Sequence, residues 1–283
     1  MNTFLTSFMI DLLDPVEDPA QMKESLRRAR AHLSAQIEPG GLVRYHGRPD
    51  GPGIGTLGCA ITPDTDDTAL VWRLAPGDDR RELAAALRTI RKYRTADGLY
   101  RTWLAPREAY QCLDPGGDPN PPDIAIQMNL LLLLANERPD DARALCKAIR
   151  KVVDDDRVWV YYRVTPLIAM LRVPDLDRAG CALELPEERM RTSVQKQEIW
   201  VSALRLLLDA EKSSAVDGEE IRSLLEELSA NDFAILRKNP PLLYHNDLTA
   251  TVSRYYWSED FGYALWLRLA HIHDRIQGKR ADS

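Results

Sequence analysis

The sequence predicts an all-α fold, and three observations support this prediction. Apolar residues recur at helical spacing, as at Met22, Leu26 and Leu33. Segments that are apolar all round alternate with segments that are apolar on one side, which is typical of buried inner helices covered by outer ones. No Gly/Ser-rich linker divides the chain. We therefore expect one domain over residues 1–283, built as a single α/α barrel of concentric inner and outer helices.

The predicted helices of the first half differ in how their apolar residues are arranged. Residues 18–37 carry charges on one face, and residues 79–95 are also amphipathic. Residues 64–75 are nearly uncharged after their first turn, and residues 122–137 are almost wholly apolar. The first two are predicted to be outer helices and the other two inner helices.

The same alternation continues in the second half. Residues 140–154 are amphipathic, residues 165–173 are apolar, and residues 192–211 form a long helical pattern. Residues 218–230 are strongly charged, and residues 258–277 close the chain. A helical solenoid would show the same alternation, so the pattern leaves closure of the barrel open.

Composition limits the partners of the chain. It has 283 residues and a net charge of -6, so we expect no strongly basic nucleic-acid face and no nucleic-acid partner. The most apolar run, residues 124–135, is shorter than the roughly 20 residues of a membrane span. A peripheral membrane contact stays open, and the sequence does not give the oligomeric state.

The cysteines and the first residues suggest a cytoplasmic protein. Asp11 and Asp14 lie near the start, without a basic n-region, so no signal peptide is expected. The cysteines lie far apart and form no C-x-x-C pair, and we expect reduced, buried thiols. They are Cys59, Cys112, Cys146 and Cys181.

Three acidic residues open the predicted helix at residues 64–75. Asp64 follows Pro63 and suits a helix N-cap, and Asp66 and Asp67 suit the positive end of the helix dipole. The helix that follows is nearly uncharged, which predicts burial. Crowded, buried carboxylates raise at least one pKa. The segment therefore predicts a carboxylic acid that keeps its proton near neutral pH.

The string Asp-Thr-Asp-Asp-Thr-Ala at residues 64–69 resembles the acid motif of class II terpene cyclases, of the squalene-hopene cyclase superfamily. The resemblance implies that Asp66 is the proton donor and that Asp64 and Asp67 hold and tune it. It implies cyclisation of a linear prenyl chain started by protonation, without an organic cofactor. In size the chain is similar to single-domain members that act on meroterpenoids, in which a prenyl chain is attached to an aromatic ring.

Carbocations formed in such a reaction are stabilised by aromatic faces. Several segments before predicted inner helices are rich in Gly and aromatic residues and loosely resemble the aromatic repeats of that superfamily, without its strict Gln-Trp pattern. For any single residue, packing in the core or a loop is the other interpretation. The candidates are Trp72, Tyr100, Trp103, Trp159, Tyr161, Tyr162, Trp200, Tyr256, Trp257 and Phe261.

Polar candidates accompany the aromatic ones. Gln127 and Asn129 lie in the buried helix that starts near Asp123, where they either orient substrate or are paired core amides. His245 lies in a polar, loop-like cluster, and the resemblance implies that a histidine orients the acid.

No metal is predicted. Residues 78–82, Asp-Asp-Arg-Arg-Glu, fit a class I terpene synthase pattern superficially but start an amphipathic helix, where capping explains them. A second class I pattern begins at Asn246 but lacks its later ligands.

Two other functions remain open. A glycan-active α/α-barrel hydrolase would place a second carboxylate opposite Asp66 across a polar groove, and Glu259 or Asp260 could supply it. A non-catalytic lipid- or protein-binding helical barrel would leave the three aspartates as an exposed helix cap.

Overall fold

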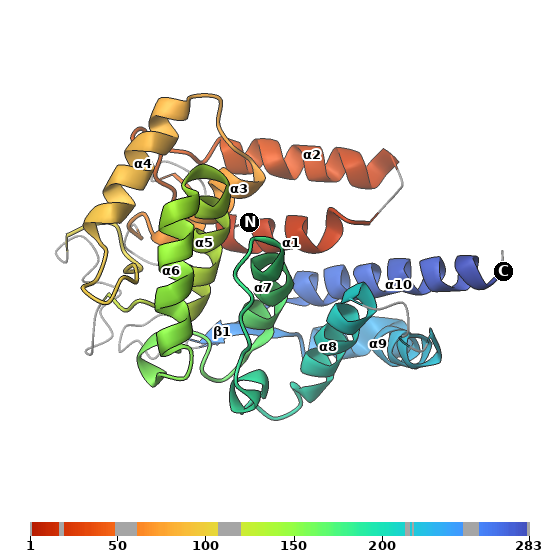
Figure 1. The fold of residues 1–283 in the computed structure, drawn as a ribbon. Helices are drawn as coiled ribbons and strands as arrows, with labels where there is room; N and C mark the ends of the chain where they lie inside the picture. Colours follow the sequence, from red (N-terminus) through yellow and green to blue (C-terminus); the bar gives the residue numbers. More distant parts are fainter. Residues whose placement is uncertain are drawn as a thin grey trace.

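A computed structural model describes residues 2–16, 20–48, 61–106, 120–212, 216, 218–245 and 255–281. Over these residues the chain forms ten α-helices and one two-stranded antiparallel sheet, so the all-α prediction is confirmed apart from a short hairpin (Figure 1).

The connections between helices vary from a single residue, between α5 and α6, to long segments before α3 and α5. In order the helices are α1 Thr3–Leu13, α2 Ala20–Ser34, α3 Thr65–Leu74, α4 Arg80–Lys92, α5 Ile124–Glu137, α6 Pro139–Val152, α7 Leu167–Arg178, α8 Glu198–Lys212, α9 Gly218–Lys238 and α10 Glu259–Ala281. Two 3₁₀ turns, η4 Asp156–Val158 and η5 Glu187–Met190, flank α7. The strands are β1 Leu242–His245 and β2 Tyr255–Trp257.

Buried and half-exposed helices alternate as the sequence predicts. In α5 every residue from Ile124 to Leu134 is buried, and in α3 every residue from Thr65 to Trp72 is buried. In α4 and α6 the buried residues instead form a single face. A helix that is apolar all round is stable only when it is buried on every side. Helices with one apolar face cover it and expose their polar face to solvent.

The buried helices pack side by side in chain order. α1 contacts α3, α3 contacts α5, and α5 contacts α7. α2 lies against α1 and α3, α4 against α3, and α6 against α5. α10 contacts α1 and is covered by α9, while α8 contacts both α7 and α10. The first turn of α3 therefore lies among α1, α5 and their connecting segments.

The four largest differences from the predicted elements concern α1, the hairpin, α8 and α9. α1 and the β1–β2 hairpin were not expected, and α8 begins at Glu198, six residues after the predicted start at residue 192. α9 runs past its predicted end at Ala230, but Ala230 is extended and residues 231–233 have positive φ. The regular helix thus stops where the charged pattern stops.

The expectation of reduced thiols is wrong for two cysteines. Cys146 of α6 is disulfide-bonded to Cys181, which follows α7, with their Cα atoms 5.8 Å apart. The packing of α5 between α6 and α7 brings together residues that are 35 positions apart in sequence. Cys59 and Cys112 lie outside the described residues. Disulfides are typical of oxidising compartments, so this bond and the cytoplasmic expectation point in different directions.

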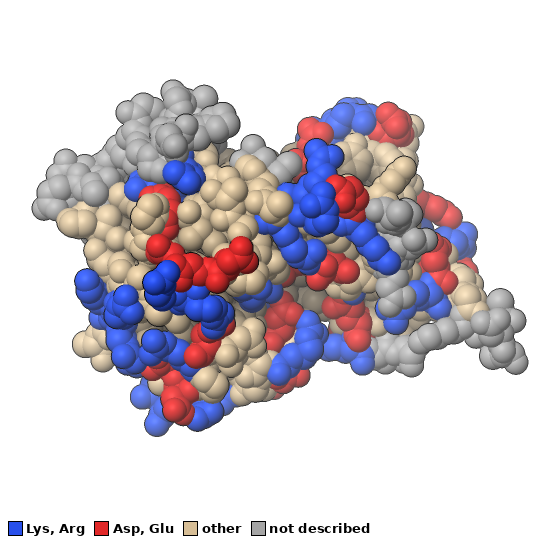
Figure 2. Space-filling view, turned by 90° about the horizontal axis from the view of Figure 1, so that it is seen from above, with Lys and Arg blue, Asp and Glu red and all other residues tan. Residues whose placement is uncertain are grey.

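The surface carries charges of both signs. Lys and Arg side chains are interspersed with Asp and Glu side chains on the face in Figure 2. Within the described ranges, no helix combines the length and the apolar character that crossing a membrane requires.

Candidate active site

The acid motif lies at the N-terminus of α3. Asp64 is the N-cap, and its Oδ1 accepts a hydrogen bond of 2.6 Å from the backbone N–H of Asp67. The cap is not exposed, since Asp64, Asp66 and Asp67 are only 3%, 7% and 2% exposed. Three carboxyl groups therefore lie within one buried helical turn.

Backbone hydrogen bonds hold this turn between two loops. Asp64 N–H donates to the carbonyl of Val43 at 3.1 Å, and Thr65 N–H donates to that of Thr102 at 2.8 Å. Asp64 also forms an antiparallel bridge with Trp103. The position of the carboxyl groups is thus fixed from both sides.

Asp66 faces α5. Its Oδ1 accepts a hydrogen bond of 2.6 Å from Asn129 Nδ2. Burial raises the pKa of Asp66 to about 8, the charge of Asp67 adds to the rise, and the bond from Asn129 opposes it. Burial outweighs the hydrogen bond, so Asp66 is mostly protonated at neutral pH.

Asp67 faces α1. Its Oδ1 lies 2.6 Å from Thr3 Oγ1, which is also 2.7 Å from the carbonyl oxygens of Arg44 and Tyr45. One hydroxyl hydrogen cannot serve three acceptors. The contact with Asp67 is the shortest of the three, and Thr3 Oγ1 donates its hydrogen there, to the carboxylate of Asp67. Burial raises the pKa of Asp67 to about 6, although the Thr3 hydrogen bond lowers it.

Asp64 is the most strongly perturbed acid of the motif. Burial raises its pKa well above the usual range, and the charges of Asp67 and Asp66 raise it further. The three aspartates therefore cannot all be ionised at neutral pH.

A fourth buried carboxyl group adjoins the motif. Asp123 is the N-cap of α5, with Oδ1 accepting from the Ala125 N–H at 3.0 Å. Its Oδ2 accepts from the N–H groups of Val160 and Tyr161, both at 2.9 Å. Burial raises the pKa of Asp123 to about 7, although these backbone donors lower it. Its charge contributes to the raised pKa of Asp66.

A cluster of tyrosines lies on the Asp67 side of the motif. Asn2 Nδ2 donates to the hydroxyls of Tyr45 and Tyr256 at 2.8 and 2.9 Å, and Tyr244 Oη donates to Tyr45 Oη at 2.9 Å. The Tyr244 and Tyr256 rings stack with centroids 5.0 Å apart, and the Tyr162 ring is 6.5 Å from that of Tyr244.

The charges of the acids contribute to the raised pKa values of two of these tyrosines. Burial raises the pKa of Tyr162, with the charge of Asp66 the next largest cause. Burial also raises the pKa of Tyr244, and the charge of Asp67 contributes. Tyr162 was a candidate from sequence, whereas Tyr244, Tyr45 and Thr3 were not.

Three candidate tryptophans bond the backbone elsewhere. The indole N–H groups of Trp72, Trp159 and Trp200 donate to the carbonyls of Gly41, Val153 and Asn239. In these contacts the three side chains anchor loops to helices.

The remaining aromatic candidates are spread over the fold. Phe261 is fully buried in α10, Tyr100 lies beneath Arg94, and Trp257 is 41% exposed on β2. Trp103 packs against Ile61, beside Asp64. Tyr161 is close enough to Asp123 and Asp64 for their charges to raise its pKa, although burial is the larger cause.

Gln127 and His245 hold backbone segments. Gln127 Oε1 accepts from Tyr100 N–H at 2.8 Å, and its Nε2 donates to the Tyr100 carbonyl at 2.7 Å. His245 is buried in β1, with Nδ1 3.1 Å from the carbonyl oxygen of Tyr161. Both side chains fix loops that border the acids.

The sequence holds two patterns that resemble class I metal-binding motifs, residues 78–82 and the pattern that begins at Asn246. Asp79 caps α4 by accepting from the Arg81 N–H at 2.8 Å, as capping predicts. Asn246 lies outside the described residues. Within the described ranges no three His, Cys, Asp or Glu side chains are grouped so that they could hold a metal ion.

Comparison with known proteins adds no assignment: no protein-family model matches the chain, and no curated protein matches it in sequence. The chemistry of the site therefore has to be argued from its own residues.

Proposed function

We propose that this chain is a class II terpene or meroterpenoid cyclase, in which Asp66 starts cyclisation of a linear prenyl chain by donating a proton. One observation carries the proposal. Asp66 is buried, its pKa is raised to about 8, and a hydrogen bond from Asn129 fixes one of its oxygens. A poorly solvated acid that is still protonated at neutral pH is what alkene protonation requires.

The hydrogen bond from Asn129 decides which oxygen carries the proton. Nδ2 of Asn129 can only donate, so Oδ1 of Asp66 acts as the carbonyl oxygen and the proton lies on Oδ2. Transfer forms a C–H bond on the alkene, leaves a carbocation there, and converts Asp66 to a carboxylate. The Asn129 bond then stabilises that carboxylate.

Aromatic rings near the acid supply stabilisation for the cation. Tyr162 and Tyr244 lie close enough to Asp66 and Asp67 to respond to their charges. A ring face attracts a cation by its quadrupole, by about 2 kcal/mol or more when the pair is desolvated. No organic cofactor is needed for this chemistry.

The α/α barrel belongs to the same proposal. Contacts run from α1 through α3, α5, α7, α8 and α10 back to α1, and α2, α4, α6 and α9 cover this ring. We take the ring as the inner wall of a barrel with the acid motif at one end.

The two other functions have less support. A hydrolase needs a second free carboxylate, but both oxygens of Asp123 are occupied by backbone N–H groups. Glu259 and Asp260 are exposed at the start of α10. A non-catalytic barrel needs the Asp triplet as an exposed cap, and all three residues are buried.

The test is incubation of wild type and Asp66→Asn with farnesylated and geranylgeranylated aromatic acids, without added metal, in D₂O. Wild type should give a cyclised product with one carbon-bound deuterium, read by mass spectrometry and NMR. Asp66→Asn should give none, because an amide is far too weak an acid. Product formation by Asp66→Asn, or product without deuterium, would contradict the proposal.

A further inference from the structure

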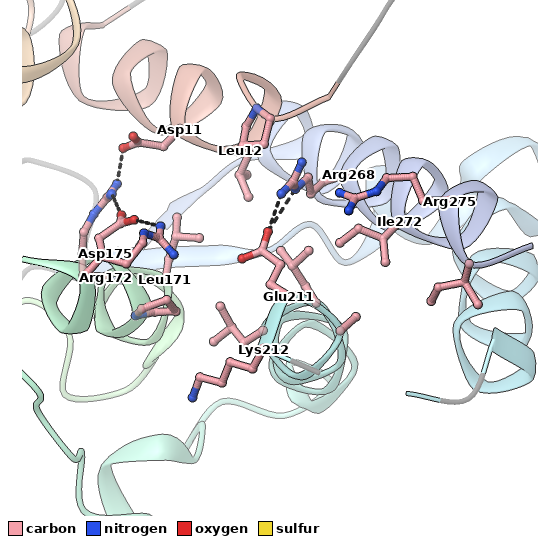
Figure 3. A pocket seen from close by; sticks show the side chains of 17 residues that line it. Asp11, Leu12, Leu171, Arg172, Asp175, Glu211, Lys212, Arg268, Ile272 and Arg275 are labelled. Carbon is pink, nitrogen blue, oxygen red and sulfur yellow. Dashed lines mark hydrogen bonds and ion pairs between the residues drawn. The ribbon is translucent and has the colours of Figure 1, made fainter. Parts of the chain in front are cut away.

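A concave site lies near the C-terminal end of α1, the opposite end from Thr3. It is an open cavity of about 660 Å³ lined by residues of α1, α7, α8 and α10 (Figure 3). It reaches Asp11, eight residues along α1 from Thr3, or about 12 Å at 1.5 Å per residue. Arg172, which lines the cavity, is fully buried and has its guanidinium 4.5 Å from the centroid of the fully buried Phe8 ring.

The wall of this cavity is amphiphilic. Leu12, Leu171, Leu207, Leu208, Ile272 and Ile276 provide an apolar surface. Five basic side chains and three acidic ones also line it, although the whole chain has a net charge of -6. The cavity thus has an excess of positive charge in an acidic protein.

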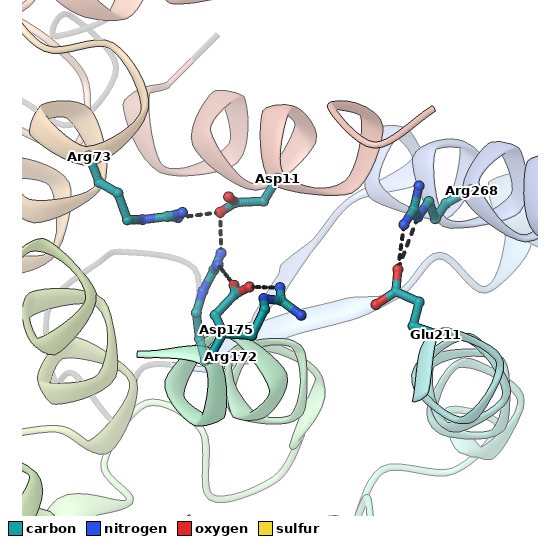
Figure 4. Close-up of polar contacts among 7 residues, drawn as sticks. Asp11, Arg73, Arg172, Asp175, Glu211 and Arg268 are labelled. Carbon is teal, nitrogen blue, oxygen red and sulfur yellow. Dashed lines mark hydrogen bonds and ion pairs between the residues drawn. The ribbon is translucent and has the colours of Figure 1, made fainter. Parts of the chain in front are cut away.

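Part of this positive charge is already neutralised. Arg172 pairs with Asp11 at 2.5 Å and with Asp175 at 3.1 Å, and Arg178 also pairs with Asp175 (Figure 4). These ion pairs form one side of the cavity, where α1 meets α7.

The opposite side retains unused donors. Arg268 donates to Glu211 Oε1 through Nε at 3.1 Å and Nη2 at 2.6 Å. Arg268 is only 6% exposed, and its buried Nη1 has no hydrogen-bond partner within the described ranges. Arg275, two turns further along α10, and Lys212 form no ion pair with any described residue. Arg268 and Arg275 both extend from α10 toward the cavity (Figure 3).

We propose that this cavity binds an amphiphilic anion, with a carboxylate or phosphate head at Arg268 and Arg275 and an apolar chain between α7 and α8. Guanidinium groups match the geometry of both kinds of head group. The volume falls in the range of about 300–1,000 Å³ typical of small-molecule sites. The buried Nη1 of Arg268 gains an acceptor when the head group is bound. Binding here is separate from the proposed chemistry at Asp66.

Calorimetric titration of the full chain with three ligands of equal chain length tests the site. They are dodecanoate and dodecyl phosphate, each below its critical micelle concentration, and dodecanol, below its solubility limit. We expect one-to-one binding of at least one anion and about tenfold or more weaker binding of dodecanol, which has no charged head. The stronger of the two anions identifies the head group.

Two variants locate the binding. Arg275→Gln removes an exposed cation without disturbing the core and should weaken anion binding about tenfold. Ala210→Trp, from α8, should fill the cavity and abolish it. Arg28→Gln, an exposed arginine of α2 outside the cavity, is the matched control and should bind as wild type does. Far-UV circular dichroism and thermal unfolding check that each variant folds.

Three results would overturn the proposal. Neither anion binds wild type, or dodecanol binds as well as the anions do. In the third, anion binding survives unchanged in both folded Ala210→Trp and Arg275→Gln, which would place the ligand elsewhere, including at Asp66.

Discussion

Nδ2 of Asn129 donates a 2.6 Å hydrogen bond to Oδ1 of Asp66 and so joins the fifth helix to the first turn of the third. The bond orients the carboxyl group and stabilises its ionised form. Burial acts in the opposite direction and prevails, since the pKa of Asp66 is raised to about 8. The side chain is thus a positioned acid rather than an ion pair.

Asp66→Asn should stabilise the protein. Folded Asp66 binds its proton more tightly than the unfolded chain does, so the free energy of unfolding falls as pH rises from about 4 to about 8. Asparagine is similar in shape to the neutral acid and does not titrate. The gain in Tm over wild type should therefore be larger at about pH 9 than at about pH 5.

Asp123→Asn is the matched comparison. Asp123 is also buried with a raised pKa, but both of its oxygens accept backbone N–H groups. An amide NH₂ cannot accept, so this variant should be destabilised by about 1–3 kcal/mol. Equal effects of the two substitutions on Tm would contradict the different roles assigned to the two acids.

Asn129→Leu should move the pH limit of activity upward. Removing the donor removes the contribution that lowers the pKa of Asp66, so the acid stays protonated above about pH 8. The rate at low pH should fall, because the carboxylate formed on proton transfer loses its hydrogen bond. The measurement is product formation by the cyclisation assay as a function of pH.

Thr3→Val should move that limit in the other direction. Thr3 lowers the pKa of Asp67, so its loss keeps Asp67 neutral to higher pH and reduces the charge that raises the pKa of Asp66. Shifts of the same sign in Asn129→Leu and Thr3→Val would point to general damage and not to tuning of one acid.

Asp11→Asn should strongly destabilise the fold. Burial raises the pKa of Asp11, but Arg172 and Arg73 outweigh it and hold the pKa below its usual range. Asp11 Oδ2 lies 2.5 Å from Arg172 and 2.6 Å from Arg73. Leaving the buried Arg172 and the half-buried Arg73 without this partner should cost about 3–5 kcal/mol by urea unfolding.

The pH dependence of this pair has the opposite sign to that of Asp66. Stability from a carboxylate with a lowered pKa is present above about pH 4 and is lost as pH falls through that lowered value. Asp14→Asn, which breaks an exposed pair with Arg30, is the control and should cost less than about 1 kcal/mol. An equally small loss of unfolding free energy in Asp11→Asn would show that the ion pairs of Asp11 do not stabilise the fold.

Reduction of the Cys146–Cys181 disulfide should lower stability. The bond closes a loop of 35 residues, and the chain-entropy relation gives about 4 kcal/mol for such a loop. Urea unfolding with and without reductant measures the loss. In Cys146→Ser the bond cannot form, so reductant should not lower the stability through it. Free thiols at both positions in protein purified without reductant would contradict the bond.

Local pattern was enough to predict most helices. Residues 122–137 and 79–95 differ in apolar periodicity, and they became a fully buried helix and a one-sided helix. The helix Thr3–Leu13 was not predicted, because its 11 residues mix Thr, Ser and Asp with apolar residues and lack the long apolar run of residues 122–137. Strands of four and three residues, Leu242–His245 and Tyr255–Trp257, are too short to show a period.

The site was predictable only in part. The three aspartates lie within four consecutive residues, and their burial follows from the nearly uncharged helix after them. Thr3 and Asn129 lie 64 and 63 positions from their partners Asp67 and Asp66, and no local pattern pairs them. Tyr244 was not predicted for a similar reason, because the β1–β2 hairpin and a hydrogen bond to the distant Tyr45 position its side chain.

The central claim is that Asp66 holds its proton at neutral pH, and ¹³C NMR titration of carboxyl-labelled protein tests it most directly. A resonance absent from Asp66→Asn identifies the residue. The account predicts that it stays at the protonated position through neutral pH and titrates near pH 8. An Asp66 carboxyl that is already ionised at pH 7, titrating near its ordinary value of about 3.9, would contradict it.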